Sequence, residues 1–236
     1  MKKITILLAE DHTIVREGIR TMIEFEDDLE VVGEAQDGRQ VIALAKKIRP
    51  AVVLMDIAMP LLNGLEATRQ ILKALPATKI LILSAHSDDA YVKNAIESGV
   101  VGFLLKQTCA HDVCLAIRDV QNGKTFFSPA ISRHLDRLHS HLLDHQNLFN
   151  EKIALLTPRE MEVLQFIAEG DANKETAAEL GISIKTVEKH RDHLMQKLDI
   201  HDTAGLTRYA ISSGVIENNA HMFSERFQRR ADRGLW

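Results

Sequence analysis

The chain contains few cysteines, and their spacing matches neither a disulfide framework nor a metal site. Cys109 and Cys114 are the only two cysteines among 236 residues, which is too few for a disulfide scaffold. His111 lies between them, but the paired spacing of a zinc site is missing. We therefore expect free or buried thiols in a reducing cytoplasm.

Long apolar stretches are also missing. No stretch approaches the roughly 18 consecutive apolar residues of a helical membrane span. The amino-terminal stretch MKKITILLAED has a basic tip, but its apolar run ends after ITILLA, so it predicts a strand rather than a secretion signal. We expect a soluble, cytoplasmic protein with no membrane partner.

Neither sign of charge is in large excess. The net charge is −4, with 26% charged and 45% hydrophobic residues, which is the composition of an ordinary globular protein. This balance alone points to no nucleic-acid partner. A length of 236 residues suits one large domain or two domains of the usual size of about 100 to 200 residues.

Five short apolar runs alternate with helical stretches in the first half of the chain. The runs are ITILLA, LEVVGEA, AVVLMD, TKILIL and VGFLL, and the segments that follow them have apolar residues at helical spacing. This alternation predicts crossover units and a parallel sheet with helices on both faces. We therefore expect residues 1–122 to form an α/β domain with a five-stranded, parallel, doubly wound sheet.

Only helical periodicity remains beyond residue 122. In a linker over residues 123–153, apolar residues at helical spacing predict one amphipathic helix; they are Ile131, Leu135, Leu138 and Leu142. The stretch 217–236 has little periodicity, and we expect a loosely ordered tail.

Residues 154–216 carry four helical stretches with explicit end signals. Thr157, Pro158 and Glu160 form a capping box that begins the first helix. Gly181 separates the second helix from a longer third helix, which Ser183 caps. Two helices joined by a short glycine turn, the second polar on one side, are typical of a helix-turn-helix. We predict an all-α, four-helix domain of this kind.

Polar side chains follow four of the predicted strands. In chain order these residues are Glu10, Asp11, Asp56, Ser84 and Lys106. Ligands of an open parallel sheet bind beyond the carboxyl ends of its strands. Three carboxylates at one such edge repel each other unless a cation joins them, and Mg²⁺ is typically held by carboxylates, waters and a phosphate. The pattern therefore predicts a metal site that handles a phosphoryl group.

The same residues suggest how a phosphoryl group would be held. Lys106 and the hydroxyl of Ser84 supply a positive charge and a hydrogen-bond donor for phosphoryl oxygens. Asp56, on a central strand, is the best candidate nucleophile. The alternative is that acids at strand ends are common and each alone carries no function. A phosphatase or phosphotransferase with an aspartyl nucleophile is a further alternative, but it would want an acid two residues later, where Ala58 stands.

Residues 1 to about 122 closely resemble the response-regulator receiver domain. The resemblance rests on the five residues above in their order, together with the pairs Met59-Pro60, Asn63-Gly64 and Ser84-Ala85 and the stretch GFLLK. It implies that Asp56 accepts a phosphoryl group from a sensor histidine kinase, and that the protein is not an enzyme.

The resemblance also implies roles for the residues around Asp56. Mg²⁺ would be held by Glu10, Asp11, Asp56 and the backbone carbonyl of Ala58. Ser84 and Phe103 would be a switch pair, in which the hydroxyl moves toward the phosphoryl group and the ring turns inward. Phe103 departs from the family pattern because it lacks a tyrosine hydroxyl, and Leu61-Leu62 replaces a site where relatives often carry glycine.

The third helix of the second half has the two faces that a helix in the DNA major groove needs. Its apolar stripe consists of Ile184, Val187, Leu194 and Leu198. Its outward residues Lys185, Glu188, Lys189, Asp192 and Gln196 are candidates to read bases. Thr186, His190 and Lys197 suit phosphate contacts, and Lys174 on the preceding helix is a further DNA-binding candidate.

Net positive charge within residues 151–217 is local to this helix. Residues 151–217 contain eight Lys and Arg against twelve Asp and Glu, whereas residues 183–198 contain four against two. A plain helical interaction module is therefore the alternative to double-stranded DNA binding.

The strings LTPREMEVLQFIAEG and NKETAAELGISIKTVEKHRDHLMQKL are similar to the carboxyl-terminal domain of the NarL/FixJ (LuxR-type) regulators. The similarity covers nearly all of residues 154–216. It implies that the third helix enters the major groove and that the last helix, around Leu206 and Tyr209, forms the contact of a homodimer. The whole chain is then expected to be a two-component response regulator whose dimer binds paired DNA half-sites. A receiver that is not used for phosphorylation is the remaining alternative.

Overall fold

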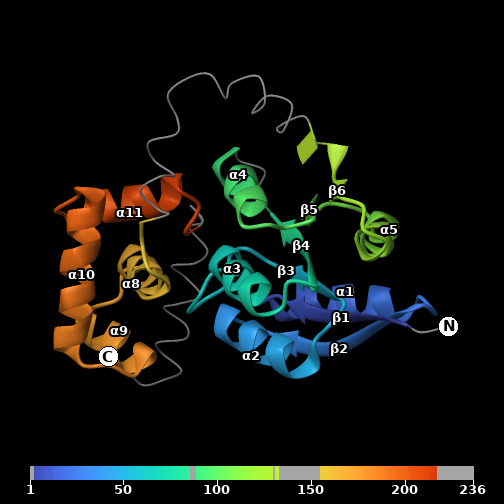
Figure 1. The fold of residues 1–236 in the computed structure, drawn as a ribbon, viewed down its shortest axis with the longest axis horizontal. Helices are drawn as coiled ribbons and strands as arrows, with labels where there is room; N and C mark the ends of the chain where they lie inside the picture. Colours follow the sequence, from blue (N-terminus) through green and yellow to red (C-terminus); the bar gives the residue numbers. More distant parts are fainter. Residues whose placement is uncertain (1–2, 86–88, 130, 133–154, 217–236) are drawn as a thin grey trace.

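The computed structural model of the chain describes residues 3–85, 89–129, 131–132 and 155–216, and it contains a sheet with helices and a group of helices beside it (Figure 1). Most of the expected linker helix, including Leu135, Leu138 and Leu142, lies outside the described residues, as does the expected tail. Ile131 is described and is fully buried.

The first part of the chain folds as alternating strands and helices, in the order expected. The elements are β1 (Ile4–Ala9), α1 (Thr13–Glu24), β2 (Leu29–Ala35), α2 (Gly38–Ile48), β3 (Val52–Met55), α3 (Gly64–Ala74), β4 (Lys79–Ser84), α4 (Asp89–Glu97), β5 (Gly102–Leu105), α5 (Ala110–Gln121) and β6 (Phe126–Phe127). All strand pairs are parallel, and the strand order is β2-β1-β3-β4-β5-β6. The α/β fold class is confirmed.

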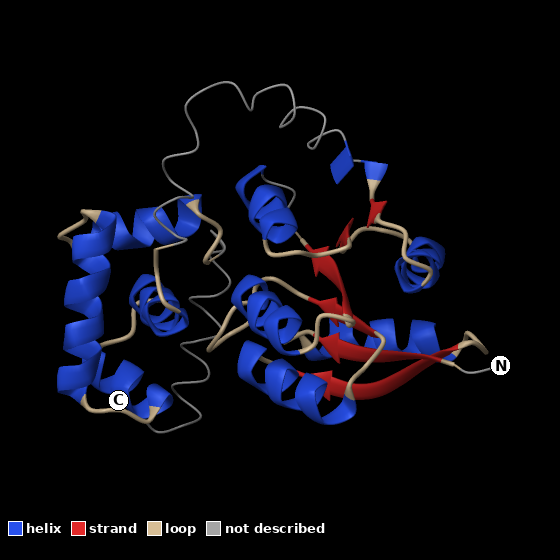
Figure 2. Cartoon of the chain, viewed as in Figure 1, coloured by secondary structure: helices blue, strands red, loops and turns tan. Residues whose placement is uncertain are grey.

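Helices cover both faces of the sheet, as Figure 2 shows. Successive side chains of a strand point to opposite faces, so Leu7 of β1 packs in the core with α2, α3 and α4. Its neighbour Leu8 packs in a second core with α1 and α5. Because both faces are buried, the strands consist of continuous apolar runs, and these runs are the signal by which the sequence predicts them.

The sheet has a sixth strand, which corrects the expectation of five. Strand β6 is only two residues long, and Phe126 and Phe127 pair with Gly102 and Phe103 of β5. Two residues are too short to show an apolar period. The sheet therefore continues past residue 122, where helical periodicity alone was expected.

The second part of the chain forms the four expected helices. They are α8 (Pro158–Ala168), α9 (Asn173–Leu180), α10 (Ile184–Leu198) and α11 (Thr203–Ser212). The capping box of Thr157 and Glu160 is present at the start of α8. Gly181 ends α9 in the left-handed conformation, and the Ser183 side chain accepts a hydrogen bond from the amide of Thr186. The predicted end signals are confirmed.

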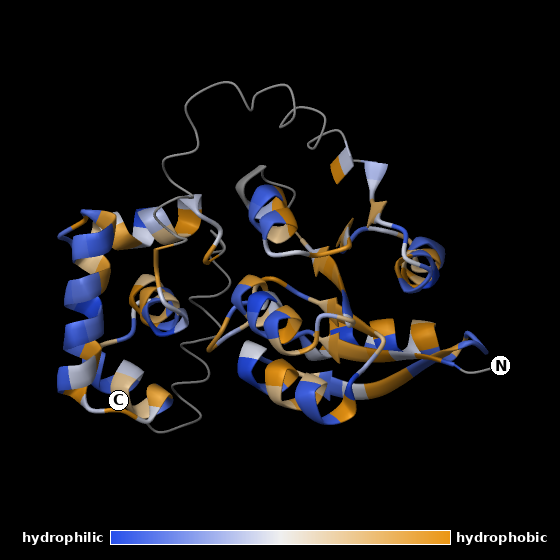
Figure 3. Ribbon diagram, viewed as in Figure 1, coloured by the Kyte–Doolittle hydropathy of each residue, from blue (hydrophilic) through white to orange (hydrophobic). Residues whose placement is uncertain are grey.

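The helical part packs against the part that contains the sheet through α8, the end of α9 and the end of α11, and α10 lies on its far side (Figure 1). The residues along α10 are mostly hydrophilic (Figure 3). Three residues of its predicted apolar stripe, Val187, Leu194 and Leu198, are buried in one core with α8 and α11, whereas the fourth, Ile184, is 45% exposed.

Gly64, at the start of α3, has no room for a side chain. A Cβ there would lie 2.0 Å from the carbonyl oxygen of Asp56, whereas a Cβ on Gly18 of α1 would meet nothing within 4 Å. We predict that Gly64→Ala lowers the free energy of unfolding by about 2 kcal/mol through overpacking.

The matched control is Gly18→Ala, which we expect to raise the free energy of unfolding by about 0.5 to 1 kcal/mol, because alanine favours a helix interior. Denaturant unfolding followed by circular dichroism measures both. Equal effects of the two substitutions would contradict the close approach of α3 to Asp56.

Candidate phosphoacceptor site and DNA-facing helix

The carboxyl ends of β1 and β3 bring the predicted acids together. Glu10, Asp11 and Asp56 each offer a carboxylate oxygen, and these atoms and a ring nitrogen of His12 lie within 4.8 Å of one another. Glu10 and Asp56 are only 1% and 2% exposed. Charged groups are rarely buried at this density without an opposite charge. The arrangement therefore calls for a cation.

Lys106 supplies part of that positive charge. Its Nζ lies 2.9 Å from Asp56 Oδ2 and 2.8 Å from Glu10 Oε2. Its backbone amide donates to the carbonyl of Ser84, which joins the ends of β4 and β5. The lysine expected from the sequence is thus placed directly at the expected nucleophile.

The charges in this cluster shift each other's protonation. Burial, and next the charge of Glu10, raise the pKa of Asp56 above its ordinary value, although Lys106 opposes this. Burial alone would lower the pKa of Lys106, but the carboxylates of Asp56 and Glu10 raise it. The lysine therefore stays charged, and one ammonium faces more than one carboxylate.

An oxygen of Asp56 is available to a metal or to phosphorus. Oδ2 is bound by Lys106, whereas the buried Oδ1 has no hydrogen-bond partner among the described residues. Several carboxylate oxygens around one such atom form the hard-oxygen ligand set that Mg²⁺ and Ca²⁺ prefer. The residues present therefore fit a divalent ion.

His12 belongs to this cluster and was missed by the sequence analysis. Its Nδ1 lies 3.0 Å from Glu10 Oε1 and 2.9 Å from Asp11 Oδ1. Burial lowers the pKa of His12, but the charges of Asp11 and Glu10 raise it more. The sequence signal that could have identified His12 is its position directly after Glu10 and Asp11. In this structure His12 covers oxygens that an ion would use.

The loop between β3 and α3, residues 57–63, forms one wall of the site. The backbone amide of Ala58 interacts with the carboxylate of Asp56. Leu61 has a φ of 66°, in the left-handed region that glycine adopts without strain. This is the position where the sequence departs from the family pattern, and Leu61 packs its side chain against the core of the helical part.

Ser84 ends β4, which pairs with β3, and Phe103 lies on the next strand, β5. Both are 0% exposed, and Phe103 pairs with Ile82 in the sheet register. The side chain of Phe103 therefore lies inside the sheet core.

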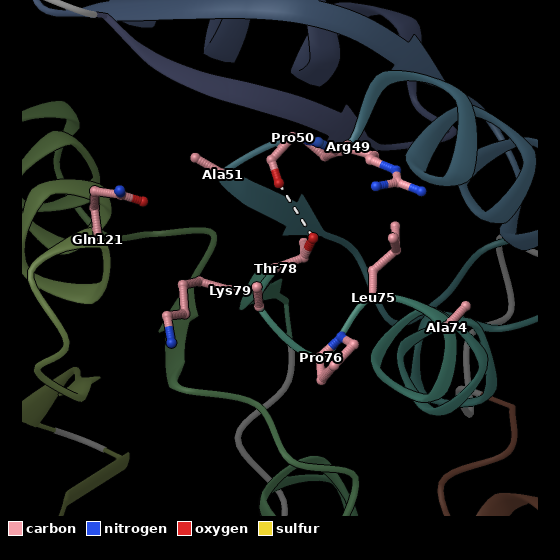
Figure 4. Close-up of a pocket in the computed structure, with 10 residues that line it drawn as sticks. Arg49, Pro50, Ala51, Ala74, Leu75, Pro76, Thr78, Lys79 and Gln121 are labelled. Carbon is pink, nitrogen blue, oxygen red and sulfur yellow. Dashed lines mark hydrogen bonds between the residues drawn. The ribbon is translucent and has the colours of Figure 1, made fainter.

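A hollow of about 490 Å³ lies at the opposite edge of the sheet. It is lined by residues at the amino ends of β3 and β4, among them Arg49, Pro50, Leu75 and Lys79, and the Thr78 hydroxyl donates to the carbonyl of Pro50 there (Figure 4). None of the acidic cluster lines it. The hollow is thus separate from the candidate site.

The outward face of α10 is accessible. Lys185, Glu188, Lys189 and Asp192 are exposed, as is Lys174 of α9, while Thr186 and His190 are half-buried. This helix therefore presents its predicted base-reading residues to solvent while the two parts of the chain are in contact.

Lys197 has a different environment from the one expected of a phosphate contact. Its Nζ lies 2.6 Å from Glu160 Oε2 and donates to the carbonyl of Leu155. Burial raises the pKa of Glu160, but the hydrogen bonds from Lys197 and Thr157 lower it below its ordinary value. Lys197 therefore stabilises the start of α8 in this structure.

Leu206 and Tyr209, expected at a dimer contact, lie inside the helical part. They are 0% and 4% exposed and belong to its core. The exposed residues of α11 are on its other side and include Ala204, Arg208 and Ser212.

Within the described part of the chain, no helix is both long and apolar enough to cross a membrane.

Two protein families match this chain. The "Response regulator receiver domain" matches residues 6–118, and "Bacterial regulatory proteins, luxR family" matches residues 154–210. The oxygen regulatory protein NreC of Staphylococcus carnosus is 36% identical over 214 residues, which are 90% of this chain and 99% of that protein. The response regulator protein VraR of Staphylococcus epidermidis is 35% identical over 214 residues, 91% of this chain and 99% of that protein.

Solved structures of full length resemble the chain as well. The RcsB response regulator of Salmonella typhimurium matches with a TM-score of 0.59 and 28% identity, over 90% of this chain and 99% of that one. RcsB from Salmonella enterica serovar Typhimurium, bound to a promoter in the presence of the phosphomimetic BeF3−, matches with a TM-score of 0.56 and 29% identity, over 89% of this chain and 99% of that one.

The raised pKa of Asp56 predicts a pH-dependent stability. Because the folded state holds the proton of Asp56 more tightly than the unfolded state does, stability is greatest below the unfolded pKa and is lost as pH rises through the raised pKa. Asp56→Asn removes the ionisable carboxyl group and therefore this loss of stability with rising pH. In metal-free protein at pH 7 we expect Asp56→Asn to raise the free energy of unfolding by on the order of 1 kcal/mol.

Denaturant unfolding at pH 4 to 8 measures this difference, which we expect to shrink toward low pH. Asp27→Asn changes an exposed residue and is expected to stay within about 0.5 kcal/mol of the unmodified protein throughout. A stability gain of Asp56→Asn that is the same at every pH would show that the charge of Asp56 is not its cause.

Proposed function

Because this chain belongs to the NarL/FixJ-type response regulators, which join a receiver domain to a LuxR-type DNA-binding domain, we propose that phosphorylation of Asp56 controls it. The chain is a signalling transcription regulator and not an enzyme. The observation that carries the proposal is the buried carboxylate of Asp56, with Oδ2 held by Lys106 and Oδ1 without a hydrogen-bond partner among the described residues.

The donor is a phosphohistidine of a sensor histidine kinase. Oδ1 of Asp56 attacks phosphorus, and a new oxygen–phosphorus bond forms. The phosphorus–nitrogen bond breaks, which leaves the histidine of the kinase unphosphorylated. Lys106 stays charged and neutralises phosphoryl oxygens as their charge builds up. The hydroxyl of Ser84 donates to the phosphoryl group, and Phe103 is its partner in the switch.

Glu10, Asp11, Asp56 and the backbone carbonyl of Ala58 would hold Mg²⁺. A bound Mg²⁺ offsets the charge that the carboxylates and the phosphoryl group bring together. The closeness of the carboxylate oxygens supports this ligand set. The ring of His12, which contacts oxygens of Glu10 and Asp11, would have to move away from them for these carboxylates to hold the ion.

The DNA-binding domain, residues 154–216, would read double-stranded DNA with α10. Its outward residues Lys185, Glu188, Lys189 and Asp192 face bases, and Thr186, His190 and Lys174 contact phosphates. The promoter-bound RcsB relative supports this use of the domain. Such a regulator works in the cytoplasm, where the chromosome lies.

A homodimer of the phosphorylated protein would bind two half-sites about one helical turn or a multiple apart. Helix α11 provides the dimer contact. Since Leu206 and Tyr209 are buried, they pack α11 against the core of its own domain. The outward side of α11, with Ala204 and Arg208, makes the dimer contact. The first domain extends through β6 (Phe126–Phe127), the segment between β6 and residue 154 links the two domains, and residues 217–236 follow the second.

The phosphoacceptor assignment is tested with a small phosphodonor such as acetyl phosphate and Mg²⁺. We expect the protein to gain one hydroxylamine-sensitive phosphoryl group, and Asp56→Asn to gain none. Lys106→Met is expected to slow the reaction by at least about tenfold, because it removes the positive charge that neutralises the phosphoryl oxygens in the transition state. Lys73→Met, which removes an exposed charge of α3, controls for net charge. Phosphate on Asp56→Asn would refute the assignment.

The DNA-reading face is tested with a duplex selected from a random pool by the unmodified protein. Lys189→Ala is expected to weaken binding by roughly tenfold, as for the loss of one contact to DNA. Lys73→Ala removes the same charge from the receiver domain and is expected to leave the affinity nearly unchanged. Equal losses in the two variants would mean that α10 does not face the duplex.

A further inference from the structure

The loop that follows the phosphoacceptor is held by the DNA-binding domain. Gln165 of α8 donates from Nε2 to the carbonyl of Met59, over 3.1 Å, and accepts with Oε1 from the amide of Asn63, over 2.9 Å. Gln165 is 2% exposed and Asn63 is 3% exposed. One side chain therefore binds backbone groups at two positions of the loop 57–63, and we call these two hydrogen bonds the clamp.

Neighbouring groups fix the orientation of this clamp. Gln165 Nε2 also donates to Glu169 Oε1 over 2.8 Å, so its amide nitrogen is directed by two acceptors. Asn63 Nδ2 donates to the carbonyl of Val215 over 3.1 Å. Leu61 packs against the helical core in spite of its left-handed backbone, a conformation that is strained for a residue other than glycine. Docking thus holds the loop in a shape that Leu61 alone disfavours.

Other contacts between the domains do not touch this loop. Tyr91 of α4 donates from its hydroxyl to the carbonyl of Ile216 over 2.6 Å, and Arg39 of α2 donates to the carbonyl of Glu179 over 2.9 Å. These contacts allow the effect of docking as a whole to be separated from the effect of Gln165 on the loop.

A phosphoryl group on Asp56 adds bulk and charge beside the loop 57–63. The amide of Asp56 is fixed to the carbonyl of Ala9 in the sheet, over 2.9 Å. Gly64 approaches the carbonyl of Asp56 so closely that a Cβ does not fit. The loop 57–63 is the wall that belongs neither to the strand ladder nor to α3. Because Gln165 binds Met59 and Asn63 near both ends of the loop, it resists movement of that wall.

We propose that Gln165 is a positioning residue for phosphoryl transfer, through which the docked DNA-binding domain slows acceptance of phosphate by Asp56. The inference rests on the proposed function, in which Asp56 is the acceptor. With acetyl phosphate, Oδ1 of Asp56 forms a bond to phosphorus, the bond from phosphorus to the acetyl oxygen breaks, and acetate leaves. Gln165 touches none of the reacting atoms and acts through the loop.

The coupling works in both directions, since linked binding equilibria are reciprocal. If the clamp opposes the loop shape of the phosphorylated state, phosphorylation weakens the clamp by the same factor. The amide of Asn63, which donates to Gln165, reports on this directly through its hydrogen exchange.

The test measures the rate of phosphorylation of the full-length chain by acetyl phosphate at saturating Mg²⁺. Gln165→Ala removes both bonds to the loop and is expected to raise the rate about fivefold or more, the effect of losing a net hydrogen bond. Gln165→Glu keeps the size and the acceptor but cannot donate to Met59, and is expected to act in the same direction. Tyr91→Phe removes a contact away from the loop and is expected to change the rate by less than about twofold.

Hydrogen exchange supplies the readout that a purely structural role of Gln165 would not move. BeF3− with Mg²⁺ is expected to accelerate exchange of the Asn63 amide in the unmodified protein and to have little further effect in Gln165→Ala. Should Gln165→Ala fail to fold, Gln165→Glu carries the test alone.

The possible outcomes separate the two claims. Absence of phosphate on the unmodified protein removes the proposed function and this inference with it. If the unmodified protein is phosphorylated and the Gln165 variants react no faster, or only as much faster as Tyr91→Phe, the phosphoacceptor assignment stands and the role of Gln165 is overturned.

Discussion

The ion pair between Lys106 and the buried carboxylates of Asp56 and Glu10 is the interaction on which the rest of the structure depends. A single ammonium at 2.9 Å and 2.8 Å from two carboxylates, with Asp11 beside them, leaves negative charge in excess. Buried charge of one sign is unstable unless a cation or a proton joins it. The described side chains therefore leave negative charge in excess, and in the proposed function an ion and a phosphoryl group would complete the site together.

In the proposed function, the fold would carry the state of this site to the DNA-binding domain. Strands β1, β3, β4 and β5 hold the cluster rigidly because each is paired along its length. The loop 57–63 is the adjustable part, and it touches the DNA-binding domain through Gln165. Helix α10 remains accessible on the far side (Figure 1). Docking therefore acts on the loop and on the end of α11, and leaves the reading face open.

Much of the fold could be predicted from the sequence, because its signals are local and strong. Buried parallel strands require unbroken apolar runs, and capping residues such as Thr157 and Ser183 mark helix ends independently of tertiary contacts. The convergence of Glu10, Asp56 and Lys106 also followed, since the carboxyl ends of parallel strands meet at one edge. Strand β6 could not be predicted, because two residues carry no period.

The rest depends on contacts that no local pattern records. Gln165 and Asn63 are ordinary polar residues 102 positions apart, and only docking gives them a role. Lys197 has the charge of a phosphate contact, but the buried Glu160 binds it. The dimer role of Leu206 is an implication of the family resemblance, but Leu206 is buried in the helical core. A helix face toward a domain core and one toward a partner have the same period.

The most direct test of the account is the affinity of the full-length protein for a selected duplex, with and without BeF3− and Mg²⁺, in the unmodified protein and in Asp56→Asn. The account predicts that BeF3− tightens binding of the unmodified protein by tenfold or more, about 1.4 kcal/mol, and leaves Asp56→Asn unchanged. Equal affinity of the unmodified protein in both conditions would contradict it.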